Sequence, residues 1–96
     1  MKKIDLNEEP EKIRNLLEND WVYVKDRGAI RKEFIFSDFV EAFGWMCKAA
    51  IIAEKLNHHP EWFNVFKRVE VTLTTHDLNG LSDLDITLAS KLDSIA

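Results

Sequence analysis

The three histidines of this chain lie close together in the sequence. His58 and His59 are adjacent in the run His58-His59-Pro60-Glu61-Trp62, and His76 ends the alternating segment that follows. An imidazole takes up and releases protons near neutral pH, because its unperturbed pKa is about 6.5. All three histidines fall at expected junctions between elements, where functional sites are often built. The pattern therefore indicates general acid–base chemistry on a small molecule.

Two other interpretations compete with acid–base catalysis. A histidine taken without context is most often a hydrogen-bonded packing residue. A zinc site needs three or four converging ligands, whereas adjacent His58 and His59 in an extended turn point apart. Glu54, four residues before His58, has the spacing either to share a metal or to orient the histidine pair. We expect no metal and no cofactor, and the residues alone leave open a small acid–base enzyme or a ligand-binding module.

The composition narrows the class of protein. The 96 residues include 46% apolar residues and predict one domain over residues 1–96. The net charge of −4 argues against a sequence-independent nucleic-acid binder, which needs clustered Lys and Arg. No apolar run is long enough to span a membrane, and the N-terminus lacks the apolar stretch of a signal peptide. A single cysteine, Cys47, cannot form an intrachain disulfide, which suits the cytoplasm.

The first half of the chain predicts a helix, two strands and a second helix. We expect the first helix over residues 7–19, with Asn7 as its N-cap. Two β-branched and aromatic runs, residues 21–25 and 30–36, are separated by a short turn and predict a hairpin. A long helix is expected over residues 38–56.

Ser37 is the expected N-cap of the long helix, which has apolar residues on two sides. One stripe has helical spacing: Phe39, Phe43, Met46, Ala50 and Ala53. Four further apolar residues lie off that stripe: Val40, Trp45, Ile51 and Ile52. A helix that is apolar on two sides commonly packs on its own sheet and also on another subunit. The sequence therefore predicts a homo-oligomer.

The second half predicts more strand and a final helix. Residues 62–75 alternate between apolar and polar types, which indicates either one long strand or two strands bent near Lys67-Arg68. A last helix is expected over residues 83–95, where Ser82 and Asp85 form a capping box. The expected fold is α+β: a four-stranded antiparallel sheet with three α-helices packed on one face.

The motifs resemble those of one family. The runs that carry the resemblance are Glu54-x-x-x-His58-His59-Pro60-Glu61-Trp62-x-Asn64-Val65-Phe66, Val69-x-Val71-x-Leu73-x-Thr75-His76-Asp77 and Gly80-Leu81-Ser82-x-x-Asp85-x-x-Leu88-Ala89. They closely resemble the pterin-4a-carbinolamine dehydratases, also known as the dimerization cofactor of a hepatocyte homeodomain transcription factor. The resemblance runs from about Trp21 to Ile95.

The resemblance implies a set of site residues. The family's catalytic histidines correspond to His58, His59 and His76. The residues that it implies for substrate binding are Glu54, Trp62, Thr75 and Asp85. This chain departs from the family in having Asn57, where relatives often carry Asp, and aliphatic Leu84 and Ile86, where many carry Arg or Trp.

The resemblance also implies a reaction and partners. The reaction is loss of water from 4a-hydroxytetrahydrobiopterin, giving a quinonoid dihydropterin in tetrahydrobiopterin recycling. We expect His58 and His76 to form the acid–base pair, and His59 either to place the hydroxyl or to assist its protonation. The family assembles as dimers and tetramers. The alternative function is a non-catalytic dimerization cofactor of a transcription factor, which would extend the location from the cytoplasm to the nucleus.

Overall fold

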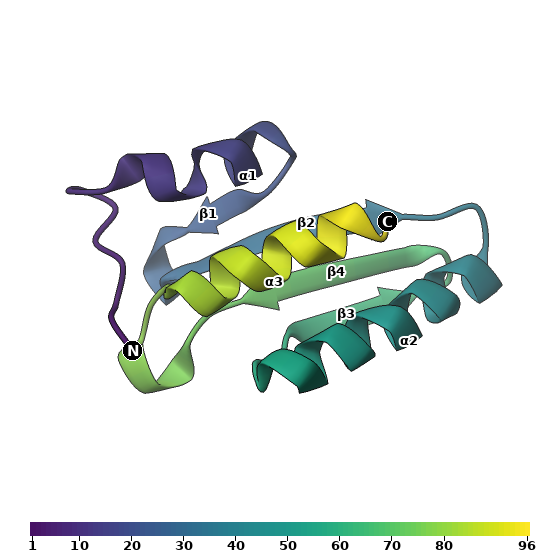
Figure 1. The fold of residues 1–96 in the computed structure, drawn as a ribbon. Helices are drawn as coiled ribbons and strands as arrows, with labels where there is room; N and C mark the ends of the chain where they lie inside the picture. Colours follow the sequence, from purple (N-terminus) through teal and green to yellow (C-terminus); the bar gives the residue numbers. More distant parts are fainter.

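Four antiparallel strands form one open sheet, and the helices cover one of its faces (Figure 1). The computed structural model describes all of residues 1–96. The strands, in the spatial order β1-β2-β4-β3, are β1 (Val22–Val24), β2 (Ala29–Ile35), β4 (Arg68–Leu73) and β3 (Glu61–Val65). The helices are α1 (Arg14–Glu18), α2 (Phe39–Leu56) and α3 (Asp83–Ser94), joined by the 3-10 turns η1 (Pro10–Ile13), η2 (Lys25–Arg27) and η3 (His76–Leu78). This architecture confirms the α+β expectation.

The inner face of the sheet forms the core with the helices. Ile30 and Phe34 of β2 are buried beside Val69 and Val71 of β4, as the alternation in both runs predicts. Lys32 also lies on this side, and its ammonium group pairs with the carboxylate of Asp93 at 2.7 Å. Because the partner is supplied by α3, the charged side chain ties the last helix to the sheet.

The alternating segment folds back on itself as two antiparallel strands, so the single long strand is wrong. The reversal occurs at Phe66 and Lys67, where Phe66 has a positive φ of 55°. The register pairs Trp62 with Val71, so Trp62 lies on the same face of the sheet as the buried Val71. Phe63 therefore lies on the outer face and is 59% exposed.

The first helical region starts later than expected. Asn7 is not an N-cap, because its N–H donates to the carboxylate of Asp5 inside a preceding turn. The carbonyl of Asp5 accepts the N–H groups of Glu8 and Glu9, which organises this turn before η1 begins at Pro10. The predicted range 7–19 therefore divides into a turn, η1 and the short α1.

Helix α2 is capped by Asp38 rather than by Ser37. The Asp38 carboxylate accepts the N–H of Glu41 at 2.8 Å, whereas the Ser37 hydroxyl bonds to the Glu41 carboxylate. A carboxylate at the N-cap also carries the charge that the positive end of the helix dipole favours.

The buried stripe of α2 also differs from the expected one. Its buried residues are Ala42, Trp45, Ala49 and Ala53. Phe39 and Phe43, which were expected to lead the core stripe, are 49% and 56% exposed. Trp45 belongs to the core, where its ring lies 4.5 Å from that of Phe34. The alanines let the helix approach the sheet closely, and this leaves the larger rings outside.

Helix α3 has the predicted start. The Ser82 hydroxyl accepts from the backbone of Asp85, and the Asp85 carboxylate accepts the Ser82 N–H at 2.9 Å, which confirms the capping box. Leu88 and Leu92 are fully buried against the sheet. None of the helices combines the length and apolar character that crossing a membrane requires.

Candidate active site

The end of α2 positions the first two histidines. Asn57 ends the helix in the left-handed region, with φ of 50°, and the N–H of His58 donates back to the carbonyl of Ala53 at 3.1 Å. Asn tolerates the left-handed conformation better than most residues. The Asn57 that departs from the family pattern thus serves as the C-cap that presents His58 and His59.

The side chain of His58 is held by a buried carboxylate. Its Nε2 lies 2.5 Å from Oδ1 of Asp85, whose side chain has no exposed surface. The other carboxylate oxygen accepts the Thr75 hydroxyl at 2.7 Å and the Ser82 N–H at 2.9 Å. These donors compensate the buried charge and fix the carboxylate against the imidazole.

The side chain of His59 pairs with the acidic residue on α2. Its Nε2 lies 2.8 Å from Oε1 of Glu54. Both side chains are largely exposed, at 58% and 80%. Glu54 therefore orients His59 in the structure, although the i, i+4 spacing pointed first to His58.

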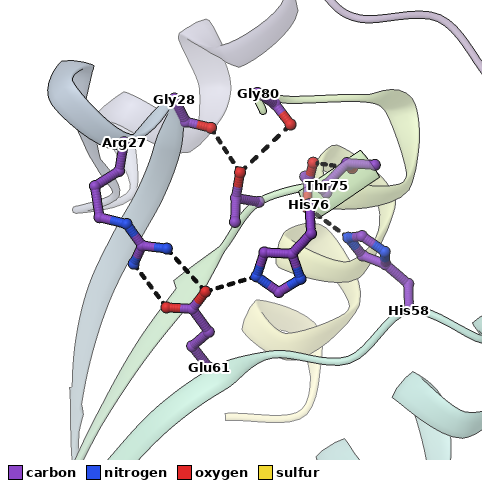
Figure 2. Close-up of polar contacts among 9 residues, drawn as sticks. Arg27, Gly28, His58, Glu61, Thr75, His76 and Gly80 are labelled. Atoms are coloured by element: carbon purple, nitrogen blue, oxygen red, sulfur yellow. Dashed lines mark hydrogen bonds and ion pairs between the residues drawn. The ribbon is translucent and has the colours of Figure 1, made fainter. Parts of the chain in front are cut away.

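His76 is held by a third carboxylate, which is itself clamped by an arginine (Figure 2). Its Nε2 lies 2.8 Å from Oε2 of Glu61. The Arg27 guanidinium donates to both oxygens of Glu61, at 2.6 and 2.9 Å. The hydrogen bond from Arg27, and next that from His76, lower the pKa of Glu61 to about 2. Glu61 is therefore ionised throughout the neutral range.

The three histidines line one hollow of about 220 Å³. Its walls are Asn57, His58, His59, Thr74, Thr75, His76 and Asp77. Thr75, predicted to bind substrate, is among them, whereas Asp85 lies behind His58 and Glu54 lies behind His59. Trp62 is outside this wall: it is half-buried against the core and borders a separate hollow beside Glu61.

The three imidazoles share one arrangement. Each directs Nε2 to a carboxylate, and an ionised carboxylate only accepts hydrogen bonds. Nε2 therefore carries a hydrogen, and Nδ1 is left to take up or release a proton in each ring. In Figure 2 the Nδ1 side of His76 faces His58. The hollow thus gathers three proton-exchanging groups of fixed tautomer.

Sequence reasoning missed two residues of this arrangement. Glu61 lies inside the quoted motif, directly after Pro60, so its place next to the histidines was an available signal. Arg27 lies 34 positions away from Glu61 in a hairpin turn, and no local pattern connects the two.

Leu84 and Ile86, the two aliphatic positions that depart from the family, do not line the hollow that holds the three histidines. Leu84 borders a second hollow of about 420 Å³ that also contacts His58 and Asn57. Ile86 packs against the core instead. No group of three His, Cys, Asp or Glu side chains is arranged to hold a metal ion.

Residues 6–95 match the family model described as pterin 4 alpha carbinolamine dehydratase. The chain belongs to the pterin-4a-carbinolamine dehydratase family. The family is one of hydro-lyases, and the resemblance seen in the motifs is thereby confirmed.

Individual dehydratase relatives match over nearly the whole chain. A Dinoroseobacter shibae protein that bears the family name provisionally is 54% identical over 94 residues, covering 98% of this chain and 97% of its own. The Drosophila melanogaster pterin-4-alpha-carbinolamine dehydratase is 47% identical over 98% of this chain, which spans about half of that longer protein (49%).

Two solved structures share the fold. The crystal structure of a transcriptional coactivator/pterin dehydratase from Brucella melitensis is 48% identical, with a TM-score of 0.91 over 99% of both chains. A pterin dehydratase-like protein identified as a RuBisCO assembly factor in the alpha-carboxysome has a TM-score of 0.70 over 80% of this chain and 89% of its own. Its 19% identity shows the likeness of fold alone.

Proposed function

We propose that residues 1–96 form one catalytic domain that removes water from 4a-hydroxytetrahydrobiopterin by metal-free histidine acid–base catalysis. Family membership supports the substrate class. The observation that carries the mechanism is the shared hollow, in which His58, His59 and His76 each hold Nε2 against a carboxylate. The reaction would return the pterin to tetrahydrobiopterin recycling as a quinonoid dihydropterin.

The dehydration needs one proton delivered and one removed. A protonated imidazole gives its Nδ1 proton to the 4a-hydroxyl, and the carbon–oxygen bond breaks as water leaves with the bonding pair. A second, neutral imidazole takes the proton from the neighbouring ring nitrogen, whose electron pair forms the new carbon–nitrogen double bond. We assign these two steps to His58 and His76, with His59 placing the hydroxyl.

The remaining predicted residues act around the histidines in this proposal. Asp85 and Thr75 support His58, and Glu54 orients His59. Trp62 is retained as a pterin contact on the β3 side, because it directly follows Glu61 and borders the hollow next to it.

A dehydration assay with and without a chelator tests the reaction. We expect the wild-type protein to accelerate dehydration of the carbinolamine above its spontaneous rate, and to keep this activity after prolonged treatment with chelator. Absence of acceleration would overturn the dehydratase proposal. Loss of activity on chelation, restored by added metal, would overturn its metal-free form.

A second candidate role is binding to a transcription factor, with the chain itself assembling as a dimer or tetramer. Helix α2 exposes four large apolar side chains: Phe39, Val40, Phe43 and Ile51. The Brucella relative is described as a coactivator as well as a dehydratase. A pull-down with a dimerising helical peptide, run beside the dehydratase assay, separates the roles. A transcription-factor role would require the protein in the nucleus as well as the cytoplasm.

A further inference from the structure

The turn between β1 and β2 is docked against the segment that carries His76. Gly28 ends η2 with φ of 58°, and its carbonyl accepts the Thr74 hydroxyl at 2.9 Å. A Cβ at Gly28 would lie 2.9 Å from the Asn79 carbonyl oxygen, so the two backbones are in close approach. This packing brings Arg27, at the end of η2, to the same side of the sheet end as His76.

Strand β3 brings the carboxylate between these two cations. Glu61 begins β3 directly after Pro60 and pairs with Thr72 of the neighbouring strand β4. Arg27 contacts both of its oxygens, and His76 contacts Oε2. A bidentate arginine fixes the plane of a carboxylate as well as its position. Arg27 therefore fixes the orientation of the Glu61 carboxylate independently of the contact with His76.

The three histidine–carboxylate pairs differ in what else holds the carboxylate. The Glu54 carboxylate makes no other hydrogen bond or ion pair, and the Asp85 carboxylate is held by the neutral donors Thr75 and Ser82. Glu61 alone also contacts a permanent cation. Arg27 and a protonated His76 then compete for the same negative charge.

We infer that Arg27 and Glu61 are positioning residues for His76: Glu61 keeps the hydrogen on Nε2 and leaves Nδ1 to the substrate, while Arg27 limits how strongly Glu61 favours the imidazolium. This inference rests on the proposed function, in which His76 must both gain and lose a proton in each turnover. Without Arg27, the negative charge of Glu61 would favour the protonated form of His76. In the Arg27–Glu61 ion pair, here called the clamp, Glu61 still fixes the tautomer of His76, and the charge of Arg27 weakens the preference for the protonated form.

Other ionisable groups also surround His76. Those lining the hollows on its two sides, apart from Arg27, are His58, His59, Asp77, Lys3, Tyr23, Lys25 and Asp26. The proposed clamp is distinguished from them by the direction of two effects. Removing the Glu61 charge makes the imidazolium less favourable, whereas removing the Arg27 charge makes it more favourable.

The test follows the titration of the His76 ring by NMR in the full-length protein, with the His76→Gln spectrum assigning the signal. Relative to wild type, Glu61→Gln should lower the titration midpoint by roughly 0.5–1 pH unit, and Arg27→Gln should raise it by a similar amount. The pH profile of kcat should move in the same two directions. In Glu61→Gln, kcat should fall roughly tenfold. This loss is smaller than the roughly 10²–10⁴-fold that a general acid or base contributes to the rate, because His76 itself is still present.

The exposed pair Arg68–Glu33, at 3.4 Å on the same sheet, supplies matched controls. Arg68→Gln and Glu33→Gln should leave the His76 titration unchanged. Midpoints that do not move, or that move in the same direction in Glu61→Gln and Arg27→Gln, would overturn the clamp. Because NMR titration needs no substrate, failure of the clamp is distinguishable from failure of the dehydratase proposal, which the wild-type assay decides.

Discussion

Nε2 of His58 lies 2.5 Å from Oδ1 of Asp85, a side chain with no exposed surface in the first turn of α3. This contact joins the turn that follows α2 to the start of α3. The same Asp85 carboxylate completes the capping box with Ser82. One buried group thus both caps a helix and orients a candidate catalytic histidine, which couples the stability of the fold to the site.

Asp85→Asn should therefore lower the free energy of unfolding by about 2–4 kcal/mol, because buried donors lose a charged acceptor. Urea denaturation measures the loss. Asp83 provides the matched control, since it is an exposed aspartate in the same helical turn. Asp83→Asn should change the free energy by under about 1 kcal/mol, and equal effects at the two positions would contradict this account.

Two glycines should respond oppositely to alanine. Gly28→Ala adds a Cβ 2.9 Å from two backbone atoms at a positive φ, so it should destabilise the protein by about 1–3 kcal/mol. Gly44 lies inside α2, and no atom beyond its own helical surroundings lies within 4 Å of where its Cβ would stand, so Gly44→Ala should stabilise by about 0.5–1 kcal/mol. Thermal unfolding of both variants gives the signs, and stabilisation by Gly28→Ala would refute the close approach.

The stability contributed by Glu61 should depend on acid pH. Its pKa is lowered from 4.5 to about 2 by Arg27 and His76, so the folded state favours the ionised carboxylate. The contribution is fully present above pH 4.5 and is lost as the pH falls through 2. We expect the difference in unfolding free energy between wild type and Glu61→Gln to shrink across this range, and a difference independent of pH would contradict the clamp.

The exposed face of α2 predicts self-association. Phe39 and Phe43 lie 6.1 Å apart between ring centroids on this face, and both are largely exposed. Phe43→Asp should shift the protein to monomers in light scattering at micromolar concentration, because a charge would be buried in the interface. Lys48→Asp, a charge change at an already charged exposed position of α2, is the control. A wild-type protein that is already monomeric would refute the assembly.

The element types could be predicted from the sequence, but the faces of α2 could not. Periodicity identified a helix with two apolar sides. Hydrophobicity ranked Phe39 and Phe43 above the small residues, yet Ala42 and Ala49 are the ones buried. Close packing against a sheet selects side chains by size as well as by polarity, and size requirements depend on the partner surface, which a single helix does not reveal.

The reversal between β3 and β4 was hidden for a different reason. Phe66 and Lys67 form the turn without Gly, Pro, Asn or Asp, the usual turn residues. Apolar residues also continue at alternate positions on both sides of the turn, although Val65 faces outward and Val69 inward. The exposed apolar residues of β3 therefore continue the alternation of the buried residues of β4, and the sequence of the two strands looks like that of one long strand.

Part of the candidate site could be predicted from the sequence, and part depends on tertiary packing. The clustering of the histidines identified His58 and His76, and the family resemblance added Asp85. The structure places both histidines at one hollow, with Asp85 bonded to His58. The pairing of Arg27 with Glu61 depends on how the hairpin turn docks on the sheet end. That contact is set by tertiary packing, so it has no signature in either local sequence.

The most direct test of metal-free acid–base catalysis is a stopped-flow dehydration assay on wild type, His58→Ala and His76→Ala. His76 is largely exposed, so its truncation should open no large cavity in the core. His58 is buried and bonds to the buried Asp85, so His58→Ala should lower the stability of the fold. Circular dichroism checks that the fold is retained. The mechanism predicts that each variant loses roughly 10²–10⁴-fold in turnover of the carbinolamine. Full activity in both folded variants would contradict it.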